Sequence, residues 1–432
     1  MTSIENGSNN LGINGKSINP PLESTTYTAF VKDSGRFRKY DLLRTAQGVL
    51  YDGAKEMRDQ HRTCWCHRGV VNTSDTVSIF RQNDGGMARV HGVPTCKSVW
   101  ACPVCSAKIC AVRQAELSGA MAAWIKQDGY VWLMTLTFPH EYHQALAGQL
   151  PKFTKAKAYF KNCKTYKRIL SKGVRKGSVT SLEVTVGLNG WHPHQHDLVF
   201  ATPDAFGTVH EDLSGSLSSA LIDDLKYAWY VALLKSGLCE RDQMSDVLKH
   251  GLDVRGGQYA AEYIAKFGRD QQWGLSREVT MHASKVGSDQ KGAHPFQLIA
   301  WAENGDAQAM AQFREYVEAF EGKRMLSWSR GLKKALTGTD EISDEQAADL
   351  KMPEESRVGG INSEQLSVLQ SRKLLSNFLN YVADYCDDVA LSQQDINDYI
   401  RWARTVPINA NGTVKTKLFS RGFMFTNREG RE

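Results

Sequence analysis

The chain has 432 residues, of which 41% are hydrophobic and 23% are charged, with 53 lysines and arginines against 47 acidic residues. This composition is that of an ordinary soluble globular protein, and the length gives room for two or three domains with a sizeable core. The net charge of +6 is too small to identify a nucleic-acid-binding protein on its own.

The N-terminal segment and the apolar runs argue against secretion or membrane insertion. The first residues are rich in Asn, Gly and Ser without an apolar core, so we expect no signal peptide. The longest apolar run, residues 227–234, is too short to span a bilayer. We therefore expect a cytoplasmic protein with no membrane partner, whose clustered cysteines are metal ligands rather than disulfides. Residues 1–40 are polar and are expected to form a disordered tail.

Six of the nine cysteines lie between residues 64 and 110. Cys102 and Cys105 form a C-x-x-C knuckle whose two thiolates can bind one ion, and Cys96 with one of two earlier cysteines would complete a tetrahedral set. His67 is an alternative ligand. The clustering favours a structural zinc site over a redox pair, so residues 41–125 are expected to form a zinc-binding segment. The candidate zinc ligands are Cys64, Cys66, Cys96, Cys102 and Cys105. Residues 107–127 have helical composition, and Cys110 within them is expected to fill space.

Residues 130–138 give the strongest strand signal in the chain, because they are β-branched or aromatic and lie between a glycine and a proline. They predict a central strand. His140 and His143 follow in a polar loop, where histidines are more often solvated than bound to metal.

Ten lysines and arginines, and no acidic residue, lie within residues 152–176. Phe153, Tyr159, Phe160 and Tyr166 are interleaved with them, which predicts an amphipathic helix with a strongly positive face. A solvated face is one interpretation of such a run. The absence of any counter-charge favours a polyanion partner.

Three histidines fall at alternate positions just as the next strand begins. Because successive strand side chains point to opposite faces, His192, His194 and His196 share one face. Residues 180–186 predict a preceding strand, and the turn at residues 187–190 would fold the two into a hairpin that brings Glu183 to the cluster. Two imidazoles and a carboxylate suit a divalent ion with open positions, such as manganese, magnesium or zinc.

Residues 258–267 predict a helix that carries two phenols on one side. At about 100° per residue, Tyr259, Glu262, Tyr263 and Lys266 fall within one arc. Taken alone, the tyrosines would most simply pack on the core. Beside a metal-binding strand, a phenol can attack a phosphodiester that the metal polarises, although its ordinary pKa of about 10 makes it a poor nucleophile. The product would be a tyrosyl-phosphate that conserves the energy of the cut bond.

These motifs resemble those of the HUH endonucleases, and among them the rolling-circle replication initiators of bacterial plasmids. Residues 133–138 resemble the first apolar strand of the family, residues 190–198 its metal-binding motif, and residues 259–266 its nucleophile helix. The cysteine-rich segment before them is also similar. Together the motifs cover roughly residues 60–270.

The resemblance implies an α+β fold, in which an RRM-like antiparallel sheet has helices on one face. It also implies that His194 and His196 are paired ligands with Glu183 or His192 as the third, and that Tyr263 is the primary nucleophile. Tyr259 would be the second nucleophile, as in two-tyrosine initiators of phages and certain transposases. Lys266 would help to hold the phenolate.

Two features depart from the plasmid initiators. Gln195 stands between the paired histidines, where the family usually has a hydrophobic residue, so packing behind the strand is expected to differ. The Tyr-x-x-x-Tyr pair differs from initiators that use one tyrosine with a glutamate, so Glu262 is either a base that activates water or a surface acid.

Residues 126–300 are thus expected to form the catalytic domain, and residues 301–432 a mainly helical accessory region. The expected function is a nickase that needs Mn²⁺ or Mg²⁺ for catalysis and Zn²⁺ for structure. It would cut single-stranded or hairpin origin DNA and leave a 3′ hydroxyl for a host DNA polymerase. Since no helicase signature appears, a host helicase is an expected partner, and homo-oligomerisation is left open. The alternatives are a transposase or relaxase with the same chemistry, or a non-catalytic zinc-containing DNA-binding regulator.

Overall fold

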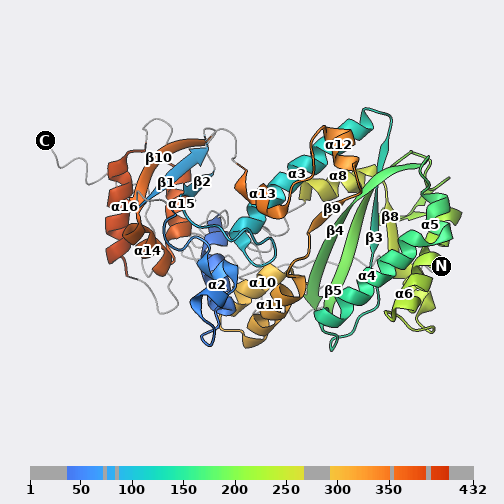
Figure 1. Cartoon of the computed structure of the whole chain (residues 1–432), viewed down its shortest axis with the longest axis horizontal. Coiled ribbons are helices and arrows are strands. Elements are labelled where there is room, and N and C mark those ends of the chain that lie inside the picture. Colours follow the sequence, from blue (N-terminus) through green and yellow to red (C-terminus); the bar gives the residue numbers. More distant parts are fainter. Residues whose placement is uncertain are drawn as a thin grey trace, which may run out of the picture.

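The computed structural model describes the chain from residue 37 to residue 407 with gaps. The described residues are 37–71, 75–82, 87–266, 292–350, 355–385 and 391–407. Most of the expected N-terminal tail lies outside them, while its last residues begin helix α2, Arg38–Leu50. The described part has two lobes along its longest axis, each built on one antiparallel sheet (Figure 1).

The larger sheet has five strands in the order β8-β3-β5-β4-β9. Its strands are β3 (Tyr130–Leu136), β4 (Arg175–Gly187), β5 (Gly190–Ala201), β8 (Leu252–Arg255) and β9 (Leu326–Trp328). The prediction that residues 130–138 form a central strand is confirmed, because β3 pairs with β5 on one side and β8 on the other. The predicted hairpin is also confirmed, and the positive φ of Gly190 (82°) allows its tight turn.

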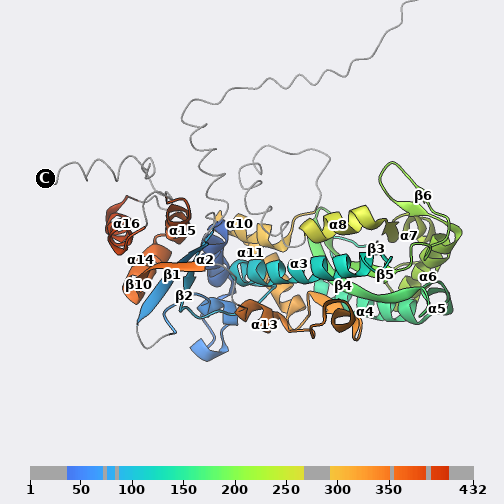
Figure 2. The ribbon, with the colours of Figure 1, turned by 90° about the horizontal axis from the view of Figure 1, so that it is seen from above.

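Helices cover both faces of this sheet, whereas the resemblance implied helices on one face only (Figure 2). One face packs on α4 (Leu146–Asn162), α5 (Lys164–Ile169) and α6 (Ala220–Ser236), and the other on α3 (Pro103–Ile125) and α8 (Gly257–Lys266). Both faces are covered because the apolar side chains of β3 point alternately to one face and the other. Trp132 and Met134 join the first core, and Val131 and Leu133 join the second.

Two of the predicted helices have different boundaries in the structure. The basic segment forms α4 and α5 rather than one helix, because the chain turns at Cys163, whose sulfur caps α5 by accepting from the Tyr166 N–H. The apolar periodicity of residues 213–236 predicts a helix over that whole range, but α6 begins only at Ala220, after a short hairpin of β6 (His210–Glu211) and β7 (Leu217–Ser218). Gly237 ends α6 in the left-handed conformation, which glycine adopts without strain. Helix α7 spans Met244–His250.

The smaller sheet joins segments that are far apart in the sequence. It has the order β10-β1-β2, where β1 is Thr76–Gln82, β2 is Ala88–His91 and β10 is Glu355–Asn362. Helices α14 (Ser363–Ser371), α15 (Leu375–Ala383) and α16 (Gln393–Thr405) complete its core. The region expected as a separate accessory domain therefore shares a sheet with the cysteine-rich segment. It also supplies β9 to the larger sheet.

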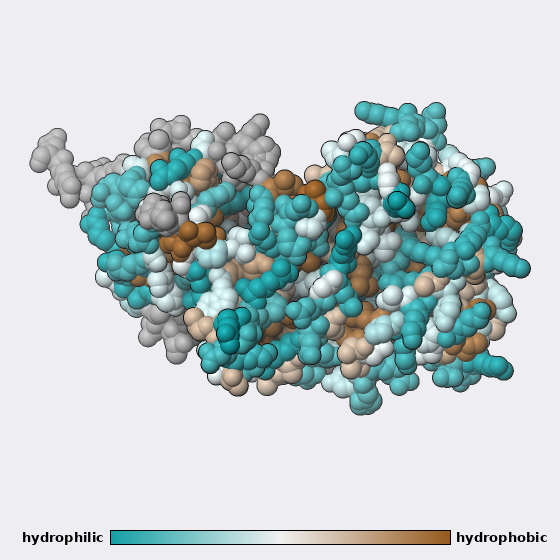
Figure 3. Space-filling model, viewed as in Figure 1, coloured by the Kyte–Doolittle hydropathy of each residue, from teal (hydrophilic) through white to brown (hydrophobic). Residues whose placement is uncertain are grey.

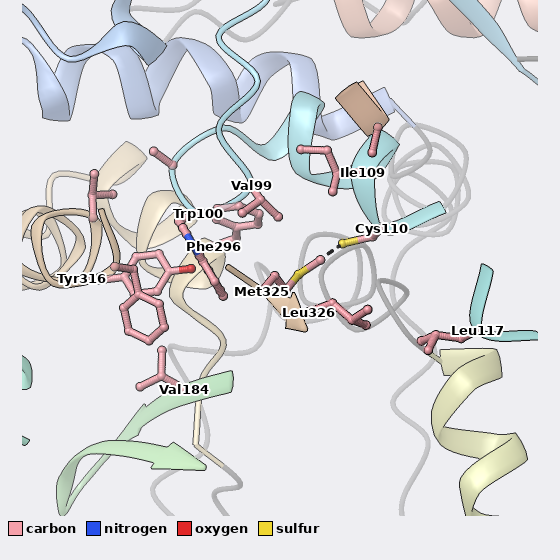
Figure 4. Packing of buried hydrophobic residues seen from close by; sticks show 14 of the residues in the cluster. Val99, Trp100, Ile109, Cys110, Leu117, Val184, Phe296, Tyr316, Met325 and Leu326 are labelled. Carbon is pink, nitrogen blue, oxygen red and sulfur yellow. Dashed lines mark hydrogen bonds between the residues drawn. The ribbon is translucent and has the colours of Figure 1, made fainter. Parts of the chain in front are cut away.

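The other helices of the described residues are η2 (Met57–Asp59), η3 (Arg62–Trp65), α10 (Pro295–Glu303), α11 (Ala307–Phe320), α12 (Leu332–Thr337) and α13 (Asp344–Asp349). Helices α10, α11 and α13 lie between the two lobes (Figure 1), whereas α12 packs on α3 and β4. Figure 4 shows the core beneath them, where Cys110 lies 3.9 Å from the Met325 sulfur among apolar side chains. This position agrees with the space-filling role predicted for Cys110.

The surface in Figure 3 is predominantly hydrophilic, with hydrophobic residues in small separate groups. None of the helices in the described residues is long and apolar enough to cross a membrane.

Candidate metal centres and nucleophile

Four of the five predicted zinc ligands come together at the start of α3. Cys102 caps this helix and Cys105 lies in its first turn, while Cys66 follows η3 and Cys96 lies in the loop after β2. The Cys66 sulfur is 3.6 Å from that of Cys102 and 3.7 Å from that of Cys105, and the Cys96 sulfur is 3.7 Å from that of Cys105.

These separations fit a tetrahedral ion. Four sulfurs at about 2.3 Å from one zinc ion stand about 3.8 Å apart. Hydrogen bonds from Cys102 and Cys105 lower the pKa of the Cys96 thiol, whereas burial and the neighbouring thiols raise that of Cys102. The two alternative zinc ligands lie outside this cluster. The Cys64 sulfur faces the backbone carbonyl of Gln47, and the buried His67 ring packs on Tyr40.

The second group of candidate ligands lies on the β4–β5 hairpin. Glu183 is directly opposite His194, and His196 lies two residues further along the same face. The Nε2 atoms of His194 and His196 are 3.5 and 3.7 Å from Glu183 Oε2. The side chains of His194 and His196 are 15% and 17% exposed and that of Glu183 is 37% exposed, so a substrate can reach an ion held there.

Neighbouring groups orient both imidazoles. His194 Nδ1 donates to the His192 carbonyl at 3.1 Å, so Nε2 faces Glu183, whose carboxylate raises the pKa of this imidazole despite its burial. His196 Nδ1 is 2.9 Å from Thr135 Oγ1. Burial opposes ionisation of Glu183, but His196 and His194 outweigh it and hold the pKa of that carboxyl well below its ordinary value. The set therefore offers two nitrogens and an anionic oxygen, which suits a divalent ion such as Mn²⁺, Mg²⁺ or Zn²⁺.

Tyr263 reaches this cluster from α8. Its hydroxyl donates to Glu183 Oε1 at 2.5 Å, and its ring lies 4.8 Å from that of His196. Burial, together with the neighbouring Glu183 carboxylate, raises the pKa of the phenol well above its ordinary value. The Glu183 carboxylate thus presents Oε2 to the imidazoles and Oε1 to the phenol.

The other candidates on α8 are placed differently. Tyr259 lies beneath the Arg255 guanidinium, which is 5.2 Å from its ring, and its hydroxyl abuts Gly215, where an added Cβ would sit 1.9 Å from the oxygen. Glu262 is exposed and accepts a hydrogen bond from Gln258 at 3.3 Å. The side chain of Lys266 lies outside the described residues.

His192 does not join the ligand set. Its Nε2 is hydrogen-bonded to Thr137 Oγ1, and its ring stacks on that of His140 at 4.6 Å. Burial, with His194 nearby, lowers the pKa of His192 to about 3, so the ring is neutral at physiological pH. Of the two third ligands left open, the structure brings Glu183 to the paired histidines.

Gln195 is explained by a buried polar group behind the strand. Its amide donates to Asp197 Oδ1 at 2.7 Å, and Thr180 donates to the same oxygen at 2.8 Å. Lys161 of α4 closes the group with an ion pair of 2.9 Å to Asp197 Oδ2. The basic segment thus supplies a structural cation, and it covers the sheet face opposite the histidines. The Lys161–Asp197 pair had no sequence signal, because its partners are far apart in the chain.

Comparisons with known proteins agree with part of this picture. Residues 87–213 match the family model described as "Replication protein". This range includes Cys96, Cys102, Cys105, Glu183, His194 and His196. It ends before α8, so the match does not extend to Tyr263.

Two relatives from Streptomyces are similar to the chain. A "Protein rep" of Streptomyces lividans is 26% identical over 337 residues, which cover 63% of this chain and 70% of the relative. A "Neomycin resistance protein" of Streptomyces cyanogenus is 29% identical over 150 residues, which cover 29% of this chain and 34% of that relative. No solved structure matches the chain at a significant level. The similarities therefore support a replication protein, and the family match covers every candidate metal ligand of the two sets except Cys66.

Proposed function

We propose that this chain initiates rolling-circle replication of a plasmid by nicking one strand at the origin with Tyr263. One observation carries the proposal: the Tyr263 hydroxyl and the His194 and His196 imidazoles meet at the two oxygens of one carboxylate, Glu183. A nucleophile and a divalent-ion site are thereby adjacent. The similarity to replication proteins supports a role of this chemistry in the initiation of replication.

The chain's own groups account for the cleavage step. Tyr263 Oη forms a bond to phosphorus while the P–O3′ bond breaks, and the departing O3′ takes up a proton from solvent. The hydrogen bond to Glu183 Oε1 orients the phenol, and the phenolic proton passes to solvent, because the low pKa of the Glu183 carboxylate makes it a weak base. When bound, a divalent ion would polarise the phosphate and stabilise the charge that builds on its oxygens.

The products explain how replication would begin. The 5′ end stays on Tyr263 as a phosphotyrosine, and the free 3′ hydroxyl primes a host DNA polymerase behind a host helicase. The four-cysteine cluster would hold a structural zinc ion, because its sulfur separations match tetrahedral coordination.

The test uses labelled single-stranded oligonucleotides tiled across the replicon that encodes the chain. With Mn²⁺ or Mg²⁺, the wild type should give a DNA adduct that survives SDS, and Tyr263→Phe should give none. Tyr159→Phe is the matched control, because this exposed tyrosine lies on α4, on the opposite sheet face. DNA binding without an adduct under either metal would favour the non-catalytic regulator. Cleavage restricted to transposon ends or a transfer origin would favour a transposase or a relaxase.

A further inference from the structure

Arg255 lies on the same sheet face as the candidate catalytic cluster. On the central strand, Thr135 pairs with His196 of β5 on one side and with Asp253 of β8 on the other. Neighbouring strands are about 4.8 Å apart, so the backbones at Asp253 and His196 are about 10 Å apart. Arg255 follows Asp253 by two residues and therefore points to the same face.

The guanidinium of Arg255 is held from two directions. Its Nε donates to Asp253 Oδ2 at 2.7 Å, and the Tyr259 ring lies beneath it at 5.2 Å. Asp253 is fixed in turn, because Ser216 of the β6–β7 hairpin donates to its other oxygen. Figure 2 shows this hairpin on the same side of the sheet as α8.

The terminal groups of Arg255 remain open to a ligand. The side chain is 34% exposed, and within the described residues its two terminal NH₂ groups have no hydrogen-bond partner. Asp212 is the other acid near it, and this carboxylate already accepts hydrogen bonds from Ser214 and Ser216. A planar fork of donors fixed at its base is the arrangement that binds a phosphate in two-point contact.

We propose that Arg255, oriented by Asp253 and stacked on Tyr259, binds a backbone phosphate of the single-stranded DNA substrate beside the scissile phosphate. The location of the scissile phosphate rests on the proposed function. Tyr259 is then the support of a phosphate-binding arginine rather than a second nucleophile. Its hydroxyl, seated against Gly215, agrees with that role.

The first test measures binding of a fluorescent single-stranded oligonucleotide at several salt concentrations, in the Tyr263→Phe background so that no cleavage intervenes. Arg255→Gln should weaken binding about tenfold, as for loss of a hydrogen bond to a charged group. It should also reduce the slope of log K against log salt by about 0.7, the value for one phosphate contact on a single strand. Arg255→Lys should keep the slope but still weaken binding. Arg401→Gln removes the same charge from α16 in the other lobe and serves as the control.

The second test separates the two roles of Tyr259. Tyr259→Leu should weaken binding as much as Arg255→Gln, whereas Tyr259→Phe, which keeps the ring, should bind and join strands nearly as the wild type does. Loss of strand joining in Tyr259→Phe would instead identify a second nucleophile and overturn the proposal. An unchanged salt slope in Arg255→Gln, or an equal change in Arg401→Gln, would also overturn it.

Failure of the proposed function gives a different result. If the wild type forms no adduct but the slope still depends on Arg255, the nickase is wrong and the phosphate contact stands. If the wild type forms the adduct and the slope does not depend on Arg255, the contact is wrong and the nickase stands.

Discussion

Replacing either Cys66 or Cys64 with alanine tests the four-cysteine centre with a matched pair. The two residues lie on either side of Trp65, and their exposed fractions are 1% and 2%, so both substitutions remove the same buried thiol volume. Only Cys66 has its sulfur within 3.7 Å of the other candidate ligands. Any difference between the variants therefore reports the metal rather than packing.

The expected difference is large. Structural zinc contributes roughly 10–16 kcal/mol to small zinc domains, which is comparable to the whole stability of a typical protein, about 5–15 kcal/mol. Cys66→Ala should therefore release zinc and unfold the segment that includes η3 and the start of α3. Cys64→Ala should lose only the packing of one thiol.

The assay is zinc release by a thiol-modifying reagent, read with a colorimetric chelator, together with thermal unfolding. We expect one zinc per chain in the wild type and in Cys64→Ala, and none in Cys66→Ala. Zinc retained by Cys66→Ala and lost by Cys64→Ala would refute the assignment. No zinc in the wild type would refute the centre itself.

Three further predictions concern the lobe that contains the larger sheet. Lys161→Met leaves the buried Asp197 without its counter-charge and should lower the free energy of unfolding by about 3–5 kcal/mol, measured by denaturant titration. The control Lys155→Met, on the exposed face of α4, should change this free energy little. Gly190→Ala should lower the free energy of unfolding by about 1–3 kcal/mol, because φ is positive and a Cβ would sit 2.8 Å from the Tyr142 Cα. The control Gly148→Ala changes an open helical position and should be neutral or stabilising. Equal melting temperatures of the two variants would contradict this prediction. Thr135→Val removes the hydroxyl beside His196 Nδ1 and should weaken Mn²⁺ binding by about 10–100-fold in calorimetry, with an unchanged affinity counting against the His196 ligand.

The sequence predicted the parts of the site that depend on local periodicity. Alternation placed His194 and His196 on one face, and a short hairpin placed Glu183 opposite them. Alternation alone could not decide between Glu183 and His192 as third ligand. That choice depends on Thr137 and His140, which come from the end of β3 and the loop after it and draw the His192 ring away.

The remaining features are non-local. Pairing of β10 with β1 joins residues almost 300 positions apart, and neither strand carries a pattern that specifies its partner. The Lys161–Asp197 pair likewise depends on how α4 lies across the sheet. In the sequence, the cations of residues 152–176 therefore seemed to have no acidic partner, although Lys161 forms an ion pair with the buried Asp197.

The position of Tyr263, the proposed nucleophile, follows from packing rather than from the candidate metal ligands. Tyr263 and Glu183 are 80 residues apart, and their hydrogen bond requires α8 to lie on the histidine face of the sheet. Ala260 and Ile264, on the inner side of α8, are buried in the same core as Val131 and Leu133 of β3. Helical spacing then turns Tyr263 toward the hairpin. The apolar residues of α8 thus place the phenol beside the imidazoles, and a substitution such as Ile264→Ala should displace Tyr263 without touching any candidate ligand.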